Sequence, residues 1–233
     1  SLLFIIGTLA LIASSIFWWR DVVSESEGGK FHNKVVQIGL RYGMILFIAS
    51  EVMFFSAWFW AFFDVAFYPG ENSQELIGRQ EALGGVFPPE DIELIPPFGI
   101  PLLNTFILLA SGGTVTWAHH ALRENDRKNF LIFLFLTILL GLIFTGFQGY
   151  EYLHATFSID EGIYPSTFYM ATGFHGAHVI IGTIFLIVCF IRGAKGHFKP
   201  EKHLGFEFAA WYWHFVDVVW LFLFTFVYWW ASF

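Results

Sequence analysis

The stretch FLIFLFLTILLGLIFTGFQGY, residues 130–150, decides the fold class, because it is long enough to cross a bilayer and contains no charged residue. A helix that crosses the hydrocarbon core needs about 20 mostly apolar residues. Long apolar runs without alternation satisfy their backbone in lipid only as helices. The sequence therefore predicts an all-α polytopic membrane protein with six transmembrane helices. The predicted spans are 1–19, 42–67, 101–118, 130–150, 166–191 and 206–231.

The composition of the 233 residues agrees with this class. Hydrophobic residues make up 56% and charged residues 13%, with 31 Phe and 10 Trp. Soluble domains usually carry about 25% charged residues. The single cysteine, Cys189, excludes a disulfide framework and a Cys-pair metal site. The formal net charge of −7 argues against nucleic-acid binding.

Basic residues are concentrated in alternate connections between the predicted spans. Eleven of the twelve fall in loops 20–41, 119–129 and 192–205, and only Arg79 falls elsewhere. The positive-inside rule therefore predicts that these three loops lie on the negative side of the membrane, in the cytoplasm or matrix. The opposite side receives the longer connection 68–100, which we expect to be structured by proline but non-helical.

Placing an ionisable residue inside a span costs free energy, so such a residue indicates function. Glu51 follows Arg41 by a stretch that places it about 15 Å into the bilayer, and His178 lies about 21 Å from the same side, counting back from Arg192. By depth alone, we predict that Glu51 and His178 form a hydrogen bond. Two interpretations of Glu51 stay open: a proton-related or gating acid, and a structural, hydrogen-bonded acid.

The intramembrane histidines also have competing interpretations. His175 and His178 are either partners in interhelical hydrogen bonds, which we favour, or proton-handling groups, or axial ligands of a haem. Nearby Gly173, Gly176 and Gly182 allow either room for a haem or close helix packing. Two more ionisable residues fall at comparable depths: His214 and Asp217.

The predicted negative side is rich in histidine. Imidazoles with an unperturbed pKa near 6.5 exchange protons readily at physiological pH. Either these side chains form an ordinary solvated surface, or they act as a proton-collecting antenna. The antenna candidates are His119, His120, His197 and His203.

Several residues next to the spans are candidate lipid contacts. At headgroup depth a phosphodiester is the natural counter-ion for a basic side chain, although the same charges also set topology. The candidates for headgroup binding are Arg20, His32, Arg192 and Lys195. Trp18 and Trp19 are typical interfacial anchors and candidates for lining a lipid pocket. We predict no catalytic, cofactor-binding or metal-binding residue in this chain.

Several long strings resemble subunit III of the haem–copper cytochrome c oxidases. They are WWRDVVSES (18–26), RYGMILFIASEVMFFSAWFWAFF (41–63), PLLNTFILLASGGTVTWAHHAL (101–122), STFYMATGFHGAHVIIGTIFLIVCFIR (166–192) and GFEFAAWYWHFVDVVWLFLF (205–224). The resemblance covers essentially the whole chain. One departure is Phe87, where the proline loop of the family usually carries Trp.

The resemblance implies a fold. The family has seven spanning helices, grouped as two and five around a V-shaped cleft that holds phospholipid. This chain resembles helices two to seven, and the first helix is absent from it. We therefore expect a single membrane domain, 1–233, in which helix 1–19 precedes the cleft and 42–231 form a five-helix bundle.

The resemblance also implies site residues and partners. Glu51 matches the buried glutamate of the family that is known for carbodiimide reactivity, while Arg20, His32, Arg192 and Lys195 fall at positions resembling those that hold lipid phosphates. Haem and copper are expected in subunits I and II and not in this chain. The implied partners are subunit I, as the main interface, subunit II and bound phospholipid. The implied location of this hetero-oligomer is a bacterial plasma membrane or a mitochondrial inner membrane.

The function implied is that of a non-redox subunit of cytochrome c oxidase. It supports electron transfer from cytochrome c to oxygen, coupled to proton pumping, by packing on subunit I, binding phospholipid and aiding proton uptake. Subunit III of a quinol oxidase is an alternative, against which the WWRDV end of the first span argues. Another alternative is a free-standing transporter. Glycine-broken helices at matching positions of two halves would favour it, and no such symmetry is found. A haem-binding membrane cytochrome is the third alternative.

Overall fold

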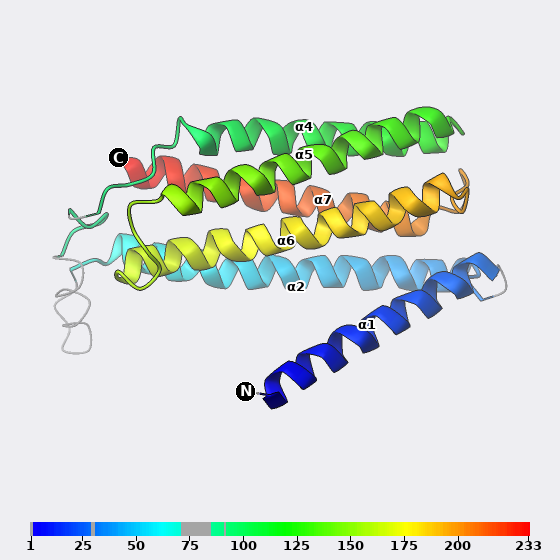
Figure 1. The fold of residues 1–233 in the computed structure, drawn as a ribbon, viewed down its shortest axis with the longest axis horizontal. Coiled ribbons are helices and arrows are strands. Elements are labelled where there is room, and N and C mark those ends of the chain that lie inside the picture. Colours follow the sequence, from blue (N-terminus) through cyan, green and yellow to red (C-terminus); the bar gives the residue numbers. More distant parts are fainter. Residues whose placement is uncertain (1, 29–30, 71–84, 91) are drawn as a thin grey trace. The chain divides into compact units, whose positions relative to one another are not determined.

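The computed structural model describes residues 2–28, 31–70, 85–90 and 92–233 (Figure 1). In this part of the chain six helices are long and apolar enough to cross a membrane, so the predicted all-α fold with six spans is confirmed. They are α1 (Leu2–Gly28), α2 (Lys34–Phe67), α4 (Ile100–Arg123), α5 (Arg127–His154), α6 (Ile163–Ala194) and α7 (Leu204–Phe222). Helix α7 continues into a π-helical turn, η1 (Leu223–Trp229), and a 3₁₀ turn, η2 (Trp230–Ser232).

The helices are longer than the predicted spans. Most of the predicted loop 20–41 is helical, because α1 runs to Gly28 and α2 begins at Lys34. Hydropathy marks the part of a helix in hydrocarbon, whereas the helix itself ends where its terminal backbone groups find caps. The side chain of Asn33 supplies such a cap by accepting a 3.0 Å hydrogen bond from the backbone N–H of Val36.

The chain consists of two compact units, residues 1–46 and 47–233. The first unit contains α1 and the beginning of α2. On α1 the guanidinium of Arg20 pairs with Asp21 at 3.0 Å and lies over the ring of Phe17 at 5.2 Å. That residues 1–233 form one membrane domain stays a prediction.

Helices α4, α5, α6 and α7 of the second unit pack against one another (Figure 1). Trp213 of α7 is fully buried, and its Nε1–H donates a 2.8 Å hydrogen bond to Ser111 of α4. A Cβ at Gly141 of α5 would lie 2.7 Å from this ring, and one at Gly182 of α6 would lie 2.9 Å from it. Small residues therefore let the indole contact three neighbouring helices at once.

The part of α2 in the second unit packs mainly through aromatic rings. Phe54 and Trp58 each lie 5.0 Å, centroid to centroid, from Phe174 of α6, and Phe55 lies 6.0 Å from Phe215 of α7. We call this set the aromatic seam. Rings at such separations attract one another in offset or edge-to-face arrangements. The seam attaches α2 to the bundle without glycine-mediated contact at these positions.

The described parts of the connection between α2 and α4 are non-helical up to Gly99, as predicted, whereas Arg79 lies outside the described residues. Phe87 in this connection lies 5.6 Å from the rings of both Phe62 and Tyr164. It also stacks on Trp230 at 6.3 Å. Phe87, which departs from the family pattern, therefore holds the connection in place through aromatic contacts.

Candidate functional site

Glu51 lies at the middle of α2, about 25 Å from either helix end at about 1.5 Å per residue. Its Oε2 is 2.9 Å from Nε2 of His178 on α6, so the structure brings together the two residues that depth alone pairs. The side chains are 22% and 12% exposed. The pair is therefore enclosed by the protein but retains an accessible edge.

The hydrogen bonds of His178 define where its protons lie. Its Nδ1 is 2.7 Å from the backbone carbonyl of Phe174. A carbonyl only accepts, so Nδ1 carries a proton and donates it. The contact between Nε2 and the carboxyl group of Glu51 then needs a second proton, which is on Glu51 in the neutral form of the pair and on His178 in the ionised form. The arrangement therefore holds one proton that can shift between an acid and an imidazole.

Aromatic side chains fix the imidazole of His178 in place. The rings of Phe55 and Phe54 in the seam lie 4.9 and 5.9 Å from it. Tyr212 of α7 is stacked on the imidazole at 6.3 Å with an interplanar angle of 16°. These contacts restrict rotation of the ring, so that Nε2 stays directed at Glu51.

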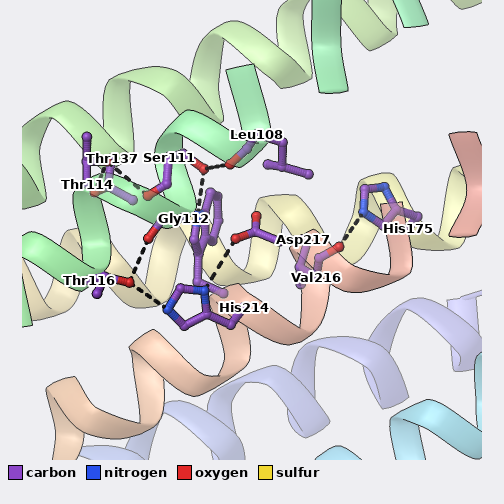
Figure 2. A network of polar contacts seen from close by, with 11 residues as sticks. Leu108, Ser111, Gly112, Thr114, Thr116, Thr137, His175, His214, Val216 and Asp217 are labelled. Atoms are coloured by element: carbon purple, nitrogen blue, oxygen red, sulfur yellow. Dashed lines mark hydrogen bonds and ion pairs between the residues drawn. The ribbon is translucent and has the colours of Figure 1, made fainter. Parts of the chain in front are cut away.

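A second polar network lies between α4 and α7 (Figure 2). Nε2 of His214 is 3.1 Å from the hydroxyl of Thr116, and Nδ1 of His214 is 3.6 Å from Asp217. The Thr116 hydroxyl donates in turn to the carbonyl of Gly112 at 2.9 Å. A Cβ at Gly112 would collide with the carboxyl group of Asp217, so a larger residue there would displace that carboxyl group.

His175 makes the interhelical hydrogen bond that the sequence analysis favoured. Its Nε2 lies 3.1 Å from the carbonyl of Val216 on α7 (Figure 2). The side chain is buried beside the rings of Phe144 and Trp220, which also contact each other. Because that carbonyl accepts, Nε2 carries a proton and is not free to bind iron. Among the described residues, no group of three or more His, Cys, Asp and Glu side chains is placed to hold a metal ion.

Two of the four antenna candidates lie in contact. Nε2 of His119, in the last turns of α4, is 3.1 Å from Nε2 of His203, which precedes α7. His120 and His197 are both exposed. The imidazole of His120 lies 6.5 Å from the ring of Trp117 and nearly perpendicular to it. The antenna role of all four stays a prediction.

The candidate lipid contacts lie in both units. The guanidinium of Arg192 lies 4.7 Å above the ring of Phe198, and Lys195 is an exposed residue at the C-terminal cap of α6. The carbonyl of His32 accepts a 3.1 Å hydrogen bond from the side chain of Gln37. The remaining candidates lie on α1: Trp18, Trp19 and Arg20.

Arg127 has a role that the sequence analysis missed, since the sequence marks it only as a topology-setting charge. Its guanidinium donates to the carbonyls of Gly193 and Ala194 at 2.9 and 2.7 Å, at the last turn of α6. A cation is favoured at a helix C-terminus, where carbonyls lack partners. Only the spatial proximity of α5 and α6 reveals this contact.

A buried acid at the other end of α5 was also missed. Glu151 is only 4% exposed, and its Oε1 accepts hydrogen bonds from Tyr228 at 2.7 Å and from the amide of Gln148 at 3.0 Å. The predicted span ends at residue 150, which places Glu151 in a loop. The signal that could have found it is the spacing of Gln148 and Glu151, which puts two polar groups on one helix face.

Comparisons with known proteins agree on a family. The family model described as cytochrome c oxidase subunit III matches residues 1–232. A curated relative from Arabidopsis thaliana, cytochrome c oxidase subunit 3, is 55% identical over 227 residues, which cover 97% of this chain and 82% of the relative. Proteins of the same name from Equus asinus and Prototheca wickerhamii are 54% and 55% identical over 232 and 231 residues. These two matches cover 100% and 99% of this chain and 85% and 84% of the relatives.

A family model that matches nearly the whole chain, with relatives above half identity, establishes membership. A subunit of such an oxidase is a component of a hetero-oligomeric oxidoreductase complex in an energy-conserving membrane, which fits the six spanning helices. The chain belongs to the cytochrome c oxidase subunit III family.

Proposed function

We propose that this chain is a non-redox subunit of its oxidase and that it supports proton uptake through the pair of Glu51 and His178. The observation that carries the proposal is the 2.9 Å contact of the two groups, while Nδ1 of His178 donates its proton to a backbone carbonyl. One mobile proton between a carboxyl group and an imidazole can be taken up and returned without leaving an unpaired charge in the membrane. The redox centres, haem and copper, belong to subunits I and II, against which this chain packs.

Protons reach the oxidase from the side of the membrane that carries the basic loops. This proposal rests on the concentration of Lys and Arg in 20–41, 119–129 and 192–205. The same surface carries His119, His120, His197 and His203, which would collect protons there. The ends of α4 and α6 and the start of α7 lie at this surface.

Phospholipid binding is the second part of the proposed function. The exposed Lys195 and the guanidinium of Arg192 both lie at the end of α6, where they would bind one lipid phosphate. Arg20 and His32 of the first unit would bind headgroups in the same way, with Trp18 and Trp19 contacting the adjoining chains.

The test is Glu51→Gln in the complete oxidase. We expect the haem spectra and the initial rate of oxygen reduction to be retained, because the pair holds no redox centre. The amide cannot exchange a proton, so proton uptake during turnover should fall and activity should decay sooner. Asp64→Asn, which removes another acid from α2, is the matched control and should behave like the parent.

Two results would contradict the proposal. Loss of the haem spectra in the Glu51→Gln oxidase would show that the residue is needed for assembly of the redox subunits. Unchanged proton uptake and unchanged durability during turnover would show that the pair exchanges no functional proton. Infrared difference spectra recorded across pH supply a direct readout, since a carboxyl band of the parent should vanish in Glu51→Gln and persist in Asp64→Asn.

A further inference from the structure

We propose that His119 and His203 form a binding site for a divalent transition-metal ion of the zinc class, at the end of the bundle where α4 ends and α7 begins. The sequence alone predicts no metal-binding residue, and the two histidines are far apart in the chain. The structure places their Nε2 atoms 3.1 Å apart. The site is independent of the pair formed by Glu51 and His178.

The separation of the two nitrogens fits one ion. Zinc binds imidazole nitrogen at about 2.0–2.1 Å with tetrahedral geometry, which places two nitrogens about 3.3 Å apart. The rings of His119 and His203 are 5.1 Å apart at 73° to each other, so that both Nε2 atoms face the same region. An ion beside the line that joins them would reach both after a small rotation of the rings.

The protonation of His203 also suits a metal ligand. Its Nδ1 lies 3.1 Å from the carbonyl of Lys199, which only accepts, so Nδ1 carries the proton and Nε2 has a free lone pair. Metal-binding histidines commonly donate their second N–H to a carbonyl in this way. The proton between the two rings therefore comes from Nε2 of His119. When the ion binds, that proton moves to Nδ1 of His119, and the ion replaces the hydrogen bond.

Both ligands are held by ordered structure. The carbonyl of His203 accepts hydrogen bonds from the N–H groups of Phe206 and Glu207 at 2.9 and 3.0 Å, in the first turn of α7. The buried ring of Phe206 packs edge-on against His119 at 5.7 Å. Such support keeps both nitrogens near the geometry that binding requires.

The donor set indicates reversible binding. Among the described residues no third His, Cys, Asp or Glu completes a cluster with the two histidines. Structural zinc sites use four protein ligands, so water would fill the remaining positions here. The bound ion would link the end of α4 to the start of α7 and would remove His119 and His203 from proton exchange.

The experiment measures zinc bound by the complete, purified oxidase after treatment with a chelator. Parent, His119→Gln and His203→Gln complexes are dialysed against Zn²⁺ at a series of buffered free concentrations, and bound zinc is measured by elemental analysis. We expect each variant to bind one equivalent fewer than the parent. His120→Gln is the matched control, since it removes the adjacent exposed imidazole, and it should bind as much zinc as the parent.

Assembly is checked on the same samples by subunit content and haem absorption. If His119→Gln fails to retain the subunit, His203→Gln still decides, because His203 lies in the connection before α7. X-ray absorption at the zinc edge gives a second readout, in which the imidazole contribution should decrease in the test variants. Equal zinc binding by the parent and His203→Gln would overturn the proposal, as would equal losses in His203→Gln and His120→Gln.

Discussion

The aromatic seam and the four-helix bundle join helices in different ways. In the bundle, Trp213 fills the space left by Gly141 and Gly182, and an added carbon atom would meet a rigid indole. In the seam, rings of α2 lie against Phe174 and Phe215, with Glu51 and His178 between them. The difference teaches that close packing around an indole fixes the shape of the bundle, whereas the seam encloses a hydrogen-bonded acid and imidazole among rings.

The two acids of these regions show the same contrast. Glu151 in the bundle is 4% exposed and accepts only from neutral donors, Tyr228 and Gln148. Glu51 in the seam is 22% exposed and faces an imidazole that can take its proton. Burial without a basic partner suits a structural acid, whereas partial exposure beside a base suits exchange.

The largest effect should come from Gly141→Val, since the new side chain would overlap Trp213. Overpacking a tight interior costs about 1–3 kcal/mol. We expect the subunit to dissociate from the oxidase at lower detergent concentration or temperature, measured by subunit content after extraction. A Cβ at Gly146 of the same helix would have no neighbouring atom within 4 Å, so Gly146→Val is the matched control. Equal retention of both variants would show that the bundle is not closely packed around the indole.

Tyr228→Phe should have the next largest effect. It removes the 2.7 Å hydrogen bond to Glu151 and leaves that buried oxygen with Gln148 alone. The loss of stability should be about 1 kcal/mol, measured from thermal dissociation of the subunit. Tyr150→Phe changes a half-exposed tyrosine of α5 and should have no measurable effect. If Tyr228→Phe left the thermal stability unchanged, Glu151 would not be a structural acid held by this hydrogen bond.

The pair in the seam should contribute less to stability. A double-mutant cycle of Glu51→Gln and His178→Gln should give a coupling energy of about 0.6 kcal/mol, the average for interhelical hydrogen bonds in membranes. The measurement is again thermal dissociation of the subunit. A coupling several times larger would mean that the pair, and not the rings, attaches α2 to the bundle.

The smallest effect belongs to Asp126, which caps α5 outside the spanning segments. The backbone N–H of Asn129 donates to its carboxylate and, together with the Asn129 side chain, holds the pKa of Asp126 below its usual range. A lowered pKa in the folded state means that the cap stabilises at neutral pH and that this contribution is lost as the pH falls through the folded value. Asp126→Ala should slightly lower the thermal stability at pH 7, and the difference from the parent should shrink in acid. A difference in thermal stability that does not change with pH would contradict the role of the Asp126 carboxylate as the cap.

Hydropathy and depth predicted much of this molecule. The six spans followed from apolar length, and counting residues from Arg41 and Arg192 gave Glu51 and His178 comparable depths, about 15 and 21 Å, where the structure has them in contact. Helix ends were wrong because polar residues continue a helix beyond hydrocarbon, and this error hid Glu151. The contacts of Arg127 with α6 and of Trp213 with two glycines join distant parts of the chain, so no local pattern indicates them.

The π-helical turn that ends α7 has a consequence for how this segment tolerates change. A π turn accommodates one more residue than an α turn, and each residue of an α-helix rotates the next by about 100°. Deleting one residue before Tyr228 would therefore let the segment rewind as an ordinary α-helix while the hydroxyl of Tyr228 stays directed at Glu151. An extra residue in an α-helix would rotate Tyr228 by about 100°, so the π turn is what lets the longer segment keep the hydrogen bond to Glu151.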